Sequence, residues 1–112
     1  MIPELEQMRA ESALRKFCER VPPDVRGQIA YEYRFRGNAV VLYERRPDFQ
    51  HPEQHSQRPF ARFVFDPSSP GWALFCADRH RRWYPYKGFE SVRQFERLAA
   101  EVERDPTGIF LG

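Results

Sequence analysis

Residues 28–36 alternate between large apolar and mostly charged side chains, and this alternation limits the fold more than any other feature of the chain. A period of two predicts a strand with one buried face and one solvated face. Gly37 and Asn38 follow as a two-residue turn, so residues 39–45 are predicted to return as the partner strand. The buried face of this hairpin would hold Tyr31, Tyr33, Phe35, Val40 and Leu42.

A second hairpin is predicted at residues 72–86, where an apolar run, a polar stretch and a second aromatic run follow one another. A two-residue turn would pair Trp83 with Cys76, and a four-residue loop would pair Trp83 with Asp78. Because these registers differ by two residues, each places Trp83 on the face of Cys76 and leaves Tyr84 on the opposite face.

Residues 59–66 alternate as well and are predicted to form a strand between the two hairpins, with Phe63 on the buried face and Phe60 on the other. Residues 46–57 are polar, contain two prolines and show no period, so we expect one long loop there. Five consecutive strands joined by turns predict an antiparallel meander, because parallel crossovers need longer connections.

Helices are predicted at both ends of the chain. Apolar residues recur at helical spacing within residues 2–21, and Pro22 stops this helix. Ser91 and Gln94 form a capping box ahead of a second apolar stripe, which ends before Pro106. The stripe of the first helix is expected to comprise Leu5, Met8, Ser12, Leu14, Phe17, Cys18 and Val21.

Together these elements predict a single α+β domain spanning residues 1–112. An antiparallel sheet commonly has one buried and one solvated face, and an amphipathic helix must cover something. We therefore expect a five-stranded antiparallel meander sheet with the N-terminal and the C-terminal helix packed on one face. The apolar tail, residues 109–111, is expected to pack back onto the core.

Several classes of site find no support in the sequence. The six glycines are scattered as single residues rather than gathered into a phosphate-binding loop. His51 and His55 are the local candidates for metal ligands, but no paired cysteines complete a site. Cys18 and Cys76 each lie among apolar residues, which is typical of buried free thiols. We therefore expect no metal and no cofactor.

The same sequence gives no sign of a membrane segment. No run approaches the roughly 18 apolar residues of a membrane span. The N-terminal residues, with acids at Glu4 and Glu6, lack the basic and apolar parts of a signal peptide. A cytoplasmic protein is the expectation.

The net charge of +2 hides an uneven distribution, because residues 26–87 hold eleven basic and six acidic side chains. Sixteen of the basic residues in the chain are arginine, whose planar guanidinium suits carboxylate and phosphate groups. A biased base composition of the source genome would account for this excess equally well.

Alternation gathers arginine and aromatic residues on the solvated face of the predicted sheet. Rings that stack on bases beside cations that neutralise phosphates are typical of surfaces that bind single-stranded nucleic acid, and acidic protein segments can use the same arginines. The pattern also fits ordinary cross-strand pairs on a wet face, or a face covered in a homodimer. The candidate binding residues are Arg34, Tyr43, Arg45, Arg62, Arg82 and Tyr84.

These observations predict a non-enzymatic binding module for an acidic partner, either a protein or single-stranded nucleic acid. The alternative is a small enzyme of unidentified type with its site at Asp78 and His80 in the hairpin turn. Nearby arginines would lower the pKa of Asp78 away from the range of a general base. We expect this carboxylate instead to accept hydrogen bonds from the turn.

Several motifs of the chain are those of one known family, and they are distinctive when taken together. They comprise Phe17, Cys18, Glu19, Arg20, Pro22, Pro23, residues 44–47, Trp72, Asp78, Arg79, Arg82, Trp83 and residues 105–110. On these residues the chain resembles, across nearly its whole length, a family of small uncharacterised bacterial proteins named domain of unknown function 3024. In that pattern an aromatic often stands at the position of Leu111, and Asn is also seen at that of His80. The family has no assigned chemistry, so the resemblance implies no catalytic or binding residues.

Overall fold

In the residues that the structure describes, five strands in one antiparallel sheet and two α-helices make up the fold, which confirms the predicted α+β class. The computed structural model describes residues 1–22, 24 and 28–111. The strand order is β1-β2-β3-β4-β5, so the sheet is the predicted meander. Along the chain the elements are α1 (Glu4–Glu19), β1 (Ala30–Arg36), β2 (Ala39–Pro47), β3 (His55–Asp66), β4 (Gly71–Ala77), β5 (Trp83–Pro85) and α2 (Phe95–Arg104).

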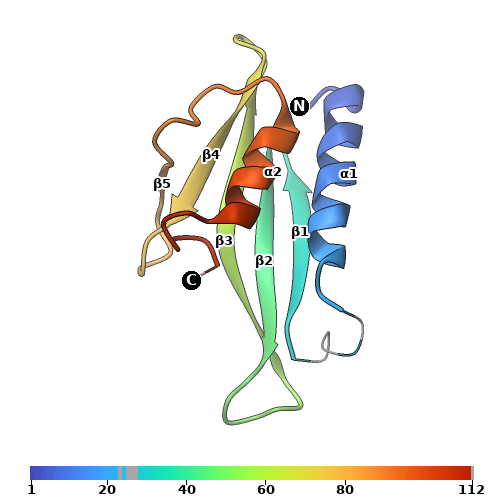
Figure 1. The fold of residues 1–112 in the computed structure, drawn as a ribbon, viewed down its shortest axis with the longest axis vertical. Helices are drawn as coiled ribbons and strands as arrows, with labels where there is room; N and C mark the ends of the chain where they lie inside the picture. The colour runs from blue at the N-terminus through green and yellow to red at the C-terminus, as the bar shows by residue number, and fades with distance from the viewer. Residues whose placement is uncertain (23, 25–27, 112) are drawn as a thin grey trace.

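Both helices lie on the same face of the sheet, as predicted (Figure 1). An aromatic cluster joins α2 to the sheet, because the ring of Phe95 lies 4.8 Å from that of Trp72 and 4.7 Å from that of Phe63. Leu14 and Phe17 of α1 are buried in the same core. The helices therefore cover one face of the sheet and leave the other open.

The buried stripe of α1 differs from the predicted one. Leu5 and Met8 are 60% and 58% exposed, whereas Ala10, Leu14 and Phe17 are buried. With about 3.6 residues per turn, Ala10, Leu14 and Phe17 fall on one side of the helix and Leu5 and Met8 fall on the opposite side. The prediction that Leu5 and Met8 face the core was therefore wrong.

The β2–β3 hairpin is longer than predicted, and the expectation of one loop over residues 46–57 was wrong. β2 continues to Pro47 and β3 begins at His55, with Arg46 paired with Ser56. This end of the hairpin projects beyond the helices (Figure 1). Neither of its faces meets the core, so neither carries the apolar alternation that marks a strand in a sequence.

A β-bulge at Phe60 changes the parity of β3. Leu42 pairs with Ala61, but Tyr43 pairs with Pro59, which leaves Phe60 as the extra residue. The Phe60 side chain is 1% exposed and packs among the aromatic rings of the core. The predicted position of Phe60 on the solvated face was therefore wrong.

The C-terminal helix begins later than predicted, at Phe95 rather than just after Ser91. The backbone of Val92 forms two hydrogen bonds with that of Trp72, of 2.8 and 2.7 Å. This bridge keeps the chain extended where the capping box was expected, and the backbone of Gln94 is extended as well. A segment that reads as the first turn of a helix thus lies along the edge of β4.

Candidate binding face

The candidate site lies on the sheet face that neither helix covers. The strand register aligns one row of side chains across all five strands, namely Arg34, Val41, Arg62, Phe75 and Pro85. Side chains directly opposite one another on neighbouring strands share a face. The row therefore places two guanidinium groups beside apolar side chains on the open surface.

The β4–β5 connection is a three-residue loop, a length that neither predicted register contains. The N–H of Asp78 donates to the carbonyl oxygen of Arg82, and the N–H of Arg81 donates to that of Asp78, each at 2.9 Å. Arg81 has a φ of 63°, the left-handed conformation typical of the third residue in a loop of this length. Glycine usually fills that position, so its absence concealed the loop length in the sequence.

This loop exchanges the predicted faces of Trp83 and Tyr84. Trp83 pairs with Ala77, and Tyr84 pairs with Cys76, which is 1% exposed in the core. Tyr84 therefore lies on the side of the sheet that the helices cover, and its predicted place on the open face was wrong. Trp83 takes that place instead, and the sequence interpretation missed it as a candidate residue.

A hollow of about 590 Å³ occupies the open face, and four strands contribute to its lining. Arg34 and Arg36 come from β1, Tyr43 from β2, Arg62 from β3 and Trp83 from β5. The structure thus brings together three of the predicted binding residues and adds Arg36 and Trp83.

Glu32, an acid of β1 on this face, already has partners. Oε1 of Glu32 accepts a 2.8 Å hydrogen bond from Nε2 of Gln57, and its Oε2 lies 3.7 Å from Nε of Arg45. Oε1 of Gln57 accepts a 3.1 Å hydrogen bond from Nη2 of Arg34, whose guanidinium lies 5.1 Å from the ring centroid of Tyr43. These contacts fix the orientation of Arg34 and hold Arg45 against Glu32, and Arg45 is not among the residues that line the hollow.

Arg36 and Arg62 are the cations of the hollow that a ligand can reach without breaking a hydrogen bond or an ion pair. Within the described residues neither guanidinium has an acid or hydrogen-bond acceptor in contact. Asp66, the other acid of this face, lies at the turn into β4, where hydrogen bonds from Ser68 lower the pKa of its carboxyl. Unpaired guanidinium groups can take carboxylate or phosphate oxygens in a bidentate manner.

Arg82 directly follows the three-residue loop and lies outside the hollow, with its Nε 3.6 Å from Oδ2 of Asp78. Oδ1 of Asp78 accepts hydrogen bonds from the backbone N–H groups of His80 and Arg82, at 2.7 and 2.9 Å. These bonds, chiefly that from Arg82, lower the pKa of the Asp78 carboxyl. The arrangement is that of an acid that closes a turn, as the sequence predicted.

Other parts of the described chain show little reactive chemistry. Burial is the main cause that raises the pKa of the Cys18 thiol to about 11, so this group stays protonated near neutral pH. No three His, Cys, Asp or Glu side chains gather as metal ligands within residues 1–22, 24 and 28–111. Over the same residues, neither helix has the length and apolar character needed to cross a membrane.

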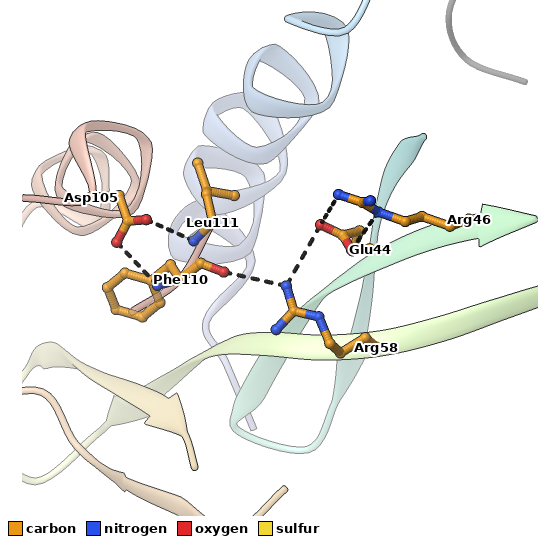
Figure 2. Close-up of polar contacts among 6 residues, drawn as sticks. All are labelled: Glu44, Arg46, Arg58, Asp105, Phe110 and Leu111. Atoms are coloured by element: carbon orange, nitrogen blue, oxygen red, sulfur yellow. Dashed lines mark hydrogen bonds and ion pairs between the residues drawn. The ribbon is translucent and has the colours of Figure 1, made fainter. Parts of the chain in front are cut away.

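The motifs at residues 44–47 and 105–110 meet beside the core, where they fix the C-terminal tail (Figure 2). Asp105 accepts hydrogen bonds from the N–H groups of Phe110 and Leu111, at 3.0 and 2.7 Å. The Arg58 guanidinium links the carbonyl oxygen of Phe110, 3.5 Å away, to the buried carboxylate of Glu44, 3.6 Å away. Phe110 is 1% exposed, which confirms that the tail packs on the core.

The comparisons with known proteins point to a family without an assigned activity. No curated protein and no solved structure matches this chain. The sequence signature described as "Domain of unknown function (DUF3024)" matches residues 2–112, which is almost all of the chain. The resemblance found in the sequence is thereby confirmed, and the chain belongs to the DUF3024 family.

Proposed function

We propose that this chain is a non-enzymatic binding module that takes an acidic partner on its open sheet face. The observation that carries the proposal is the hollow lined by Arg34, Arg36, Tyr43, Arg62 and Trp83. Two of its guanidinium groups have no acid within reach in the described part of the chain, and Glu32 on the same face is paired with Arg45 and Gln57. An anion entering this hollow gains charge-assisted hydrogen bonds without displacing an existing partner.

Two classes of acidic partner fit such a face, namely acidic protein segments and single-stranded nucleic acid. A second copy of the chain is a third candidate occupant, since an open sheet face that carries apolar side chains can be buried in a homodimer. As part of the same proposal, we place the protein in the cytoplasm, where its two free cysteines remain reduced.

The alternative function, an enzyme centred on Asp78 and His80, has weaker support. A general base needs a pKa near the working pH, whereas the backbone N–H donors of the turn lower the pKa of Asp78. The same carboxylate accepts two hydrogen bonds that close the loop. Removing its charge would therefore disturb the hairpin before it affected any chemistry.

The test of the proposal is retention on an immobilised polyanion such as heparin. We expect the double variant Arg36→Gln and Arg62→Gln to elute at clearly lower salt than the wild type, because both free guanidinium groups of the hollow are removed. The matched control is the variant Arg93→Gln and Arg97→Gln, which removes the same charge from exposed positions in and before α2.

The control variant should elute close to the wild type, and thermal melting should show that both variants are folded. Equal shifts for the two variants would mean that retention follows net charge alone. That result, or a wild type that is not retained at low salt, would contradict a binding role for this face.

A further inference from the structure

We infer that the partner of the open face is single-stranded nucleic acid, an inference that rests on the proposed function. The feature that selects this class is the position of the Trp83 ring, which lines the same hollow as the unpaired groups of Arg36 and Arg62. An aromatic ring offers a flat face on which a base can stack, and neighbouring cations neutralise the phosphates. An acidic peptide would use the guanidinium groups but would leave the ring without a matching contact.

Trp83 is a partly exposed ring of the hollow on which no other described ring or cation stacks. Two other rings line the hollow. That of Tyr43 already carries the Arg34 guanidinium at 5.1 Å from its centroid, and that of Phe35 packs against the ring of Tyr33, with the centroids 6.1 Å apart. No such cation lies over Trp83 within the described ranges, and the short β5 strand carries it at the edge of the sheet. A strand of nucleic acid can therefore approach this ring from solvent.

The row of side chains across the sheet suits an extended polymer. Arg34, Val41, Arg62, Phe75 and Pro85 follow one another across strands spaced about 4.8 Å apart, so charged and apolar positions alternate over much of the width. Phosphates and bases alternate in the same way along a single strand. A duplex keeps its bases stacked inside, so it could contact the arginines but not the Trp83 ring.

The experiment measures the anisotropy of a dye-labelled oligodeoxythymidine of about ten nucleotides, within the site sizes known for small single-strand binders. We expect binding that weakens with salt, and Trp83→Leu should weaken it by about 5- to 100-fold, the decrease expected when one base no longer stacks. Trp83→Phe is the matched control for Trp83→Leu, because both variants keep an apolar side chain at this position but only Phe keeps a ring on which a base can stack. It should retain most of the affinity.

A second readout uses the two tryptophans of the chain. Trp72 is fully buried, so stacking by a base should quench the fluorescence of Trp83 alone, and the wild type should lose the more exposed part of its emission. The variant Arg36→Gln and Arg62→Gln should flatten the salt dependence, with the slope of log K against log salt smaller by about 0.7 for each phosphate that is no longer neutralised.

Four results would overturn the inference. One is equal affinity for the Trp83→Leu and Trp83→Phe variants, and another is equal affinity for the oligonucleotide and its duplex. The third is that a polyglutamate peptide binds, and binds more weakly to the Arg36 and Arg62 variant, whereas the oligonucleotide does not bind. That result would support the proposed function and contradict the nucleic-acid partner. The last is a protein that sediments as a dimer and binds neither probe, which would contradict both the nucleic-acid partner and the proposed function.

Discussion

Replacing Trp72 by alanine is expected to lower the free energy of unfolding by about 3–5 kcal/mol, the usual cost of truncating a buried aromatic side chain to Ala. Trp72 is fully buried, and its ring packs on Phe65 and Phe95 at 5.3 and 4.8 Å between centroids. It joins β3, β4 and α2, so the cavity left by Ala would lie where the layers meet. Domains of this size hold about 5–15 kcal/mol in all, and the melting temperature should fall by more than about 10 °C.

The indole N–H of Trp72 supplies a control that separates packing from hydrogen bonding. It donates a 3.1 Å hydrogen bond to Oε2 of Glu6 in α1. Trp72→Phe keeps a ring but removes this donor, so we expect it to cost much less than Trp72→Ala. Chemical denaturation measured by circular dichroism gives both values, and similar decreases for the two variants would show that the ring is not the main contribution.

Truncating Phe110 to alanine is expected to cost about 3–5 kcal/mol although it stands close to the C-terminal end of the chain. Its side chain is 1% exposed and its ring lies 5.1 Å from that of Tyr86. The backbone around it is fixed by Asp105 and Arg58 (Figure 2), so the site cannot easily collapse around the cavity.

The neighbouring Ile109 is the matched control for this prediction. It is 36% exposed, so Ile109→Ala should change the free energy of unfolding much less than Phe110→Ala. Thermal melts of the two variants provide the comparison. A tail that is unimportant for stability would give two melting curves that both overlay that of the wild type.

The order of the elements and the sheet topology could be predicted from the sequence, because they depend on local periodicity. Alternation in residues 28–36 marked one strand, and the turn at Gly37 fixed its pairing with the next. That pairing is as predicted, with Tyr33 opposite Leu42 and Arg34 opposite Val41. One buried face and one open face follow from the same pattern.

The composition of the open face could be predicted only in part, because it depends on single-residue shifts in register. Arg34, Tyr43 and Arg62 were placed correctly by alternation. Trp83 and Tyr84 were exchanged, because a loop of three residues with an arginine in the left-handed position carries no glycine signal. The signal in the sequence that could have indicated the three-residue loop was Asp78, whose carboxylate accepts hydrogen bonds from the backbone of His80 and Arg82.

The bulge in β3 and the start of α2 depend on contacts that no local pattern contains. Phe60 is drawn into the core by aromatic rings from α1 and β1. Ser91 has the spacing of a helix cap, but the bridge between Val92 and Trp72 holds this segment extended. In both places tertiary packing overrides the local propensity.

The family motifs explain the fold more than they explain the binding face. Asp105 and Glu44 fix the tail, and Asp78 closes the β4–β5 loop. Of the motif residues that the structure describes, Trp83 is the one that lines the hollow, and the Asp78 loop determines its position there. The loop that Asp78 closes thus also orients Trp83, the ring that we propose contacts the ligand.

The central claim, that ligands meet the uncovered sheet face, is tested most directly by nuclear magnetic resonance of the labelled protein during titration with a short polyanion. We expect the shift changes to gather on β1, β2 and β3 around Arg34 and Arg62, and the indole N–H signal of Trp83 to move while that of buried Trp72 stays. Shift changes centred on α1 and α2, with both indole signals unmoved, would contradict the claim.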